Sequence, residues 1–263
     1  MQKSLIQRVD SVETESFIAL YAAAEAWGTG THTLDGVTAV WSRQDDDPSF
    51  SCVLNLANAS QPERTLADLE QAVRERGGLV FGVDTHPDLD ALVSEERLQQ
   101  LGFVRDSQEC IWALDLTAGF AADCAPADIE IVQAGPADSD VFARTLNQGW
   151  SLPEHAARGY IFAQGIGISG WHQYMAYVEG ELAGIAVLFI HDRVADCFLS
   201  ATLPEFRGKG IQTALIERRL KDGVRAGCNL ATSQTVVHNA SPRNMARRGF
   251  QPLYRRWIYG KRL

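Results

Sequence analysis

The chain has 263 residues, a length that fits one large domain or two domains of roughly 120 to 140 residues, and we expect two. Hydrophobic residues make up 46% of the chain and charged residues 22%, which is enough for an ordinary core and excludes the disordered and fibrous classes. The formal net charge is −9, and no apolar run reaches the roughly 18 residues of a membrane span or resembles a signal peptide, so we expect a soluble, cytoplasmic protein.

Cysteine spacing and charge distribution narrow the class of ligand. The five cysteines are scattered and form no C-x-x-C pair, so we expect neither a metal site nor a disulfide framework. Residues 1–120 carry a net charge of −12, whereas residues 121–263 carry +3, and the segment 205–263 contains 13 basic and 3 acidic residues. An acidic half tethered to a basic segment favours a small phosphorylated ligand over a nucleic acid.

The first half alternates predicted helices and strands. Apolar side chains at helical spacing predict a helix over residues 11–27, which ends at Gly28. Two short apolar runs, 37–42 and 50–56, are separated by the turn 45–48 and predict a hairpin. The remaining elements expected in this half are helix 66–76, strand 79–83, helix 94–101 and strand 108–116.

The second half repeats this scheme. Three successive strands joined by short polar turns predict an antiparallel meander, and a helix with apolar residues at i, i+4 and i+8 follows it. The expected elements are strand 129–133, helices 138–148 and 154–163, strands 172–178, 182–190 and 195–202, helix 211–226, strand 229–235, and a final helix and strand.

A short internal repeat supports duplication. Residues 96–103 (ERLQQLGF) and 243–250 (RNMARRGF) each precede a strand that contains a tryptophan. The weakly patterned segment 117–127 is the natural linker between the two copies. We therefore expect two domains, residues 1–120 and 121–263.

One glycine-containing loop stands between a predicted strand and a predicted helix. Gly208 and Gly210 remove side chains where backbone N–H groups must approach a ligand closely, and the helix start adds unpaired amides and a positive dipole. Arg207 and Lys209 place positive charge beside them. The pattern is neither a Walker loop nor a dinucleotide fingerprint. It predicts an anion-binding site, the alternative being a plain strand-to-helix turn.

The loop in this context resembles the acyl-CoA site of the GNAT superfamily of N-acetyltransferases, whose pattern is R/Q-x-x-G-x-G/A. The resemblance covers residues 128–263, and residues 1–120 look like a degenerate copy without the loop. It implies an α+β fold of two tandem GNAT-like domains, each a mixed, mostly antiparallel sheet flanked by helices. It also implies that only the second domain binds acetyl-CoA, as acyl donor.

The residues that would bind acetyl-CoA follow from the same resemblance. They lie on the strand end, the loop, the first helical turn and the last helix. They are Ala201, Thr202, Leu203, Arg207, Gly208, Lys209, Gly210, Ile211, Gln212, Thr213, Ser241 and Asn244. The sequence departs from the usual pattern at Gln212, where Gly or Ala is common in the family.

The resemblance also locates the transfer chemistry. An open strand edge at 200–202 would pair with the amide groups of the pantetheine arm, and a backbone N–H there would stabilise an oxyanion. Asp196, on the strand that leads to the loop, is a weak candidate for the general base, because a polar residue at a hairpin end near the turn 191–193 is the more ordinary interpretation. Many family members use a Tyr as the general acid, but Met245 stands at that position here.

Several further residues have two interpretations. His172 and His191 titrate near neutral pH and could act as a base, but both flank predicted strand ends and are expected on the surface. Glu154 and His155 lie where the family forms its acceptor pocket. Two aromatic residues, Trp150 and Trp171, either shape that pocket or pack in the core or at its rim.

These observations favour an enzyme that transfers acetyl from acetyl-CoA to a primary amine of a small molecule or peptide in a ternary complex. An acyl-enzyme on Cys197 lacks an adjacent histidine to activate the thiol. The alternative is a non-catalytic acyl-CoA sensor, which the missing Tyr favours. Nucleic-acid and membrane partners are not expected.

Overall fold

The computed structural model describes residues 4–85, 93–120, 126, 128–237 and 241–263. The chain divides into two compact units: unit 1 comprises Met1–Glu13 and Ile111–Leu253, and unit 2 comprises Thr14–Cys110 and Tyr254–Leu263. The units interleave along the chain because helix α1 (Leu5–Ala23) and strands β5 (Val104–Asp115) and β12 (Gln251–Arg262) each contribute residues to both. The domains expected at 1–120 and 121–263 stay a prediction.

Unit 2 is built on the strand order β1-β2-β3-β4-β12. Its pairings are antiparallel except for β3 with β4, which run parallel. Its elements are β1 (Thr29–Leu34), β2 (Val37–Ser42), β3 (Cys52–Leu54), α2 (Pro62–Glu75), β4 (Val80–Asp84) and α3 (Glu95–Gln100), with short 3-10 turns η1 (Glu25–Trp27) and η2 (Leu56–Asn58).

The core of unit 2 forms where helix α2 covers strand β2. Leu66, Leu69 and Val73 recur at helical spacing and are all buried, and every residue of β2 is buried as well. The hairpin expected from residues 37–56 is confirmed by the pairing of Thr38 with Leu54. Strand β1 was not expected, since its sequence TGTHTL lacks apolar alternation.

Unit 1 has the strand order β5-β11-β9-β8-β7-β6, with β10 paired to β8 outside this path. β6 with β7, β7 with β8, β8 with β9 and β10 with β8 pair antiparallel, whereas β11 and β9 run parallel. The elements are β6 (Ile129–Gln133), η3 (Pro136–Asp138), α4 (Ser139–Gly149), α5 (Ala157–Ala163), β7 (Trp171–Val178), β8 (Glu181–His191), β9 (Val194–Asp196), β10 (Ser200–Thr202), η4 (Pro204–Phe206), α6 (Ile211–Arg225), β11 (Leu230–Val236) and α7 (Ser241–Arg247).

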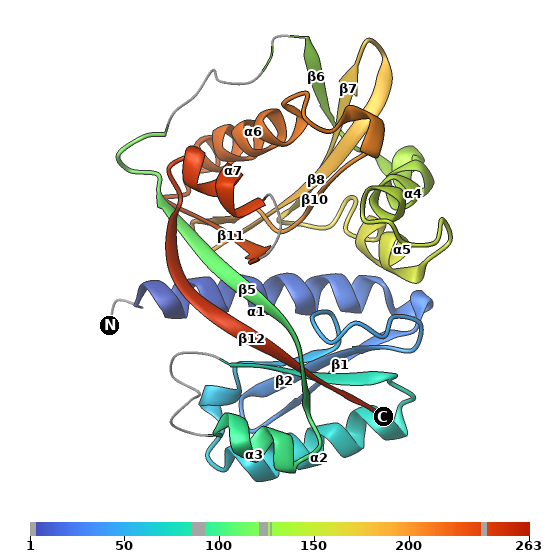
Figure 1. Cartoon of the computed structure of the whole chain (residues 1–263), viewed down its shortest axis with the longest axis vertical. Helices are drawn as coiled ribbons and strands as arrows, with labels where there is room; N and C mark the ends of the chain where they lie inside the picture. The colour runs from blue at the N-terminus through green and yellow to red at the C-terminus, as the bar shows by residue number, and fades with distance from the viewer. Residues whose placement is uncertain (1–3, 86–92, 121–125, 127, 238–240) are drawn as a thin grey trace. The chain divides into compact units, whose positions relative to one another are not determined.

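The expected meander is present in unit 1, and helix α6 packs on it. Figure 1 shows α6 lying across the strands, with α7 beside it and α4 and α5 grouped together. Close packing of α6 depends on Gly223, since a Cβ there would lie 2.7 Å from Cβ of Ala195 on β9. Both units thus have the predicted mixed, mostly antiparallel sheet with helices. None of the described helices is long and apolar enough to cross a bilayer.

Candidate functional site

The strand expected over residues 195–202 is interrupted, and the interruption creates the site. Residues 197–199 leave the ladder between β9 and β10. Arg219 of α6 is 1% exposed, and its Nη1 donates to the carbonyl oxygens of Val187 and Leu199 at 3.1 and 3.2 Å. A buried guanidinium therefore satisfies carbonyl groups beside the break.

Strand β10 presents one open edge. Backbone bonds join Leu199 and Leu203 to β8, so the peptide groups of these residues and of Ala201 between them face β8. The N–H and C=O groups of Ser200 and Thr202 consequently point the other way. There, the described part of β11 pairs with β9 rather than with β10. Among the residues that the structure describes, no other strand pairs with this edge, which carries backbone donors and acceptors.

The end of helix α4 closes on this edge. A Cβ on Gly149 would lie 2.7 Å from Cβ of Ala201, so only glycine allows this approach. The indole Nε1 of Trp150 donates to the carbonyl oxygen of Ser200 at 3.0 Å. Nη2 of Arg207 donates to the carbonyl oxygen of Gly149 at 2.9 Å. Arg207, expected to serve a phosphate, therefore also ties the loop to α4.

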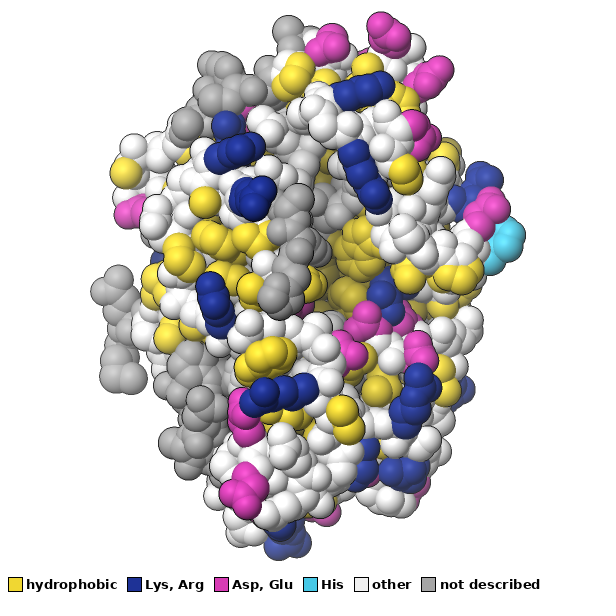
Figure 2. Space-filling model, viewed as in Figure 1, with side chains coloured by type: hydrophobic (Ala, Val, Ile, Leu, Met, Phe, Trp, Pro, Cys, Tyr) yellow, Lys and Arg dark blue, Asp and Glu magenta, His cyan; other side chains and the backbone are white. Residues whose placement is uncertain are grey.

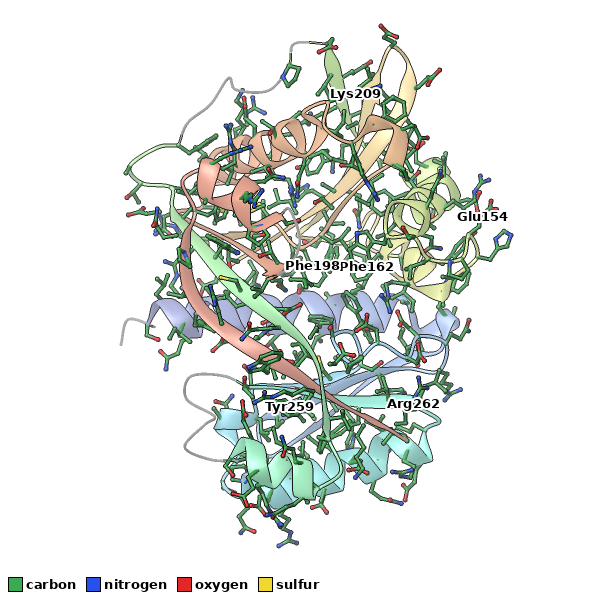
Figure 3. The ribbon with its side chains drawn as sticks, viewed as in Figure 1. Glu154, Phe162, Phe198, Lys209, Tyr259 and Arg262 are labelled. Atoms are coloured by element: carbon green, nitrogen blue, oxygen red, sulfur yellow. The ribbon has the colours of Figure 1, made fainter. Side chains whose placement is uncertain are left out.

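The loop between η4 and α6 has the backbone that its glycines predict. Gly208 and Gly210 have φ values of 79° and 84°, in the left-handed region that disfavours other residues. A Cβ at Gly208 would meet nothing within 4 Å, whereas one at Gly210 would lie 2.8 Å from Cγ of Pro126. The exposed Lys209 extends from this loop, as Figure 3 shows, with Nζ 4.8 Å from the ring centroid of Phe206.

The first turn of α6 adds amide donors directly after the loop. Gly210 is the N-cap, and the bond from Ala214 N to Gly210 O closes the first helical turn. The amides of Ile211, Gln212 and Thr213 therefore lack intrahelical acceptors. No acidic residue occupies this turn, so the positive end of the helix dipole is not offset there.

Three predicted residues from two helices meet at one point. Nε2 of Gln212 lies 3.4 Å from Oγ of Ser241, and Nδ2 of Asn244 donates to Oε1 of Gln212. All three side chains are half-buried. The sequence spacing of about 30 residues between Gln212 and Asn244 gave no indication of this direct contact.

The acid–base candidates occupy buried positions. Asp196 is 2% exposed and lies on the opposite face of β9 from Ala195, which faces α6. Met245 is 2% exposed and belongs to the core. Complete burial raises the pKa of the Cys197 thiol to about 11, so the thiol is protonated at neutral pH and is a poor nucleophile.

The other polar candidates lie further out. His172 is half-buried on β7, where burial lowers its pKa, and His191 ends β8. Glu154 and His155 are exposed in the segment between α4 and α5, and Oε1 of Glu154 lies 3.7 Å from Nη1 of Arg144. In the described residues, no group of three His, Cys, Asp or Glu side chains is arranged to hold a metal ion.

A cluster of buried aromatic side chains includes Phe198, which lies in the interruption between β9 and β10. The ring centroid of Phe198 lies 5.6 Å from that of Trp171 and 5.7 Å from that of Phe162, and Figure 3 shows Phe162 and Phe198 side by side. Trp171 is 2% exposed, so its core interpretation holds. Figure 2 shows a hollow lined by hydrophobic side chains in the upper half of the view, beside α4.

Comparison with known proteins agrees with this geometry. Residues 143–250 match the acetyltransferase (GNAT) family. No curated protein matches the sequence significantly.

Solved structures resemble the whole chain. A GCN5-related N-acetyltransferase from Kribbella flavida has a TM-score of 0.66 and 13% identity, over 99% of this chain and 96% of that one. A GCN5-related N-acetyltransferase from Sphaerobacter thermophilus has a TM-score of 0.62 and 13% identity, over 92% and 84%. A tandem GNAT protein from the clavulanic acid biosynthesis pathway has a TM-score of 0.59 and 14% identity, over 96% and 95%. These similarities establish the fold.

Proposed function

We propose that this protein, in which residues 143–250 belong to the GNAT acetyltransferase family, transfers an acetyl group from acetyl-CoA to a primary amine by direct attack in a ternary complex. One observation carries the proposal. The continuous segment 200–213 contains the open edge of β10, the loop with two glycines at positive φ, and the start of α6, where no side chain caps the helix. A strand edge can pair with the amide groups of a pantetheine arm, and a cluster of backbone amides can bind a diphosphate.

The residues of the segment fit a phosphorylated ligand with an amide-containing arm. The amides of residues 211–213 and the side chains of Arg207 and Lys209 are donors or cations suited to a diphosphate. Gly208 leaves open space where a side chain would block approach. The outward N–H and C=O groups of Thr202 can pair with an amide as a further strand would. Bound acetyl-CoA would supply an activated thioester at this edge.

The chain's own groups would then orient the amine and accept its proton. Asp196 is the candidate base, on β9, the strand that comes before β10 in the chain. An outward N–H of β10 can stabilise negative charge on the acyl oxygen without any particular side chain. The high pKa of Cys197 supports direct attack by the amine over transfer through an acyl-enzyme. The acceptor is proposed to be a small-molecule or peptide amine.

A non-catalytic acyl-CoA sensor is the alternative, and one observation favours it. The position at which the family commonly has a Tyr acid holds Met245, which is 2% exposed and carries no proton to donate. A sensor needs the segment 200–213 but neither acid nor base.

Thiol release from acetyl-CoA, followed with a panel of primary amines, separates the two functions. The enzyme proposal expects thiol release that depends on the amine and on enzyme concentration. Thermal stabilisation by acetyl-CoA with no release for any amine would favour the sensor. No stabilisation and no release would refute both. The combined variant Arg207→Ala, Gly210→Asp serves as the control, because it disrupts the anion-binding loop.

A further inference from the structure

The side chain of Gln212 joins the start of α6 to α7. Its Nε2 lies 3.4 Å from Oγ of Ser241, and its Oε1 accepts from Nδ2 of Asn244. Both ends of one amide are therefore engaged by the same helix. The side chain is directed to α7, and the structure shows no bond from it to the amides of its own helical turn among the described residues.

Helix α7 is short and packs against β11. It spans seven residues, Ser241–Arg247, and Met245 is its one buried residue. A helix this short is not stable in isolation, so its position depends on contacts with its neighbours. The two bonds to Gln212 supply such contacts on the side that faces the start of α6.

The bonds also fix the orientation of Asn244. Because Nδ2 donates to Gln212, the Oδ1 acceptor of Asn244 is left for another donor. In the same way, the bond from Gln212 Nε2 uses a lone pair of the Ser241 oxygen and leaves its hydroxyl proton free to be donated elsewhere.

We propose that Gln212 is a positioning residue, which sets α7 against the start of α6 so that Ser241 and Asn244 reach the acetyl-CoA site in a fixed orientation. The inference rests on the proposed function, because it takes acetyl-CoA as the ligand of this site. It explains why a glutamine occupies a position at which the family commonly has Gly or Ala. The side chain of this glutamine serves α7, whereas its backbone amide remains one of the donors at the start of α6.

Calorimetric titration with CoA tests the proposal without any acceptor amine. Gln212→Met keeps the length of the side chain and removes both bonds, and Asn244→Ala removes one of them from the other helix. Each variant is expected to bind CoA about tenfold more weakly, as expected for loss of one or two hydrogen bonds. The double variant is expected to bind no more weakly than the weaker single variant, because the residues act as one unit.

Gln71→Met is the matched control. Gln71 is an exposed glutamine on α2 in unit 2, and its Nε2 donates to Oε1 of Glu75 at 2.8 Å. Its removal is expected to leave the Kd for CoA unchanged.

Two results would overturn the inference. One is a Gln212→Met variant with a lower Tm but the Kd of the control, which indicates a merely structural role. The other is a double variant whose loss equals the product of the two single losses. Failure of the unaltered protein to bind CoA would instead refute the proposed function, and the inference with it.

Discussion

Each unit contains a helix that follows a short strand, a 3-10 turn and a loop, but the residues at the starts of these two helices differ in charge and in hydrogen-bonding capacity. In unit 1 the order is β10, η4, loop and α6, and in unit 2 it is β3, η2, loop and α2. Helix α6 starts after Gly210 in the left-handed region, with no acid in its first turn. Helix α2 has Gln61 as N-cap with φ of −136°, then Pro62, which has no N–H, and Glu63.

Unit 2 also supplies its own anion at this place. Oδ2 of Asp35, from the turn between β1 and β2, accepts from the backbone N of Ser60 at 2.7 Å and from its Oγ at 2.8 Å. These hydrogen bonds lower the pKa of Asp35. If unit 1 binds acetyl-CoA as proposed, a shared strand-turn-helix framework is not sufficient for phosphate binding. The glycine conformations and the amides at the start of α6 would then distinguish unit 1 from unit 2, where Asp35 and Pro62 occupy the matching place.

The largest effect is expected from the combined variant Arg207→Ala, Gly210→Asp. It should abolish measurable CoA binding, because a carboxylate would face the diphosphate and a side chain at φ 84° would meet Pro126. Gly77→Asp in unit 2 is the matched control, since its φ of 81° imposes a similar backbone strain of about 1–2 kcal/mol. Titration of both with CoA checks the expectation, and similar losses in both would attribute the effect to strain alone.

Asp196→Asn should separate chemistry from binding. Asp196 lies on β9, the strand before β10, whereas β2, the strand before β3 in unit 2, reads VTAVWS and has no carboxyl group. Loss of a general base typically lowers kcat by about 100-fold or more, and the Kd for CoA should not change. Steady-state kinetics with the preferred amine provides the measurement. A kcat equal to that of the unaltered protein would remove Asp196 from the mechanism.

Trp150→Phe should have a moderate effect. It removes the hydrogen bond from the indole to the carbonyl oxygen of Ser200 while keeping an aromatic ring. Loss of one such bond costs about 1 kcal/mol, so the affinity for CoA should fall roughly fivefold. Unit 2 offers Trp257→Phe as a control on β12, outside the site. Equal affinities for both variants would show that α4 does not support the open edge.

Asp35→Asn should have the smallest effect and touch unit 2 alone. Because the pKa of Asp35 is lowered in the folded state, its contribution to stability is present above the ordinary value of 3.8 and is lost as pH falls through the lowered value. The variant should therefore lower Tm at neutral pH and show a smaller fall of Tm below pH 3.8. It should not create a second CoA site, because Pro62 and Glu63 remain. Scanning calorimetry and a titration stoichiometry of one check both points.

Much of the fold could be predicted because local patterns and tertiary structure agree. The strand 129–133 and the starts of several helices follow from apolar periodicity, and the two loop glycines have the positive φ that their positions required. Strand β1 was missed because an exposed strand needs no apolar alternation. The break at 197–199 was missed, and so was the bond from Arg219 to the carbonyl oxygen of Leu199, because sequence alone does not distinguish the buried Arg219 from the half-buried Arg218 beside it.

Candidate site residues on one continuous segment could be predicted more fully than those that meet through the fold. The segment 207–213 carries its own signal in its glycines and charges. The contacts from Gln212 to α7 and from Arg207 to Gly149 join residues 29 or more positions apart. No local pattern encodes such pairs, so they could be found only in the folded chain.

A crystal structure of the protein with bound CoA is the most direct test of the account. It should place the diphosphate against the glycine loop 207–210 and the amides of residues 211–213, with the pantetheine arm along the outer edge of β10 and unit 2 without nucleotide. Diphosphate bound at any other location, or at the start of α2, would contradict it.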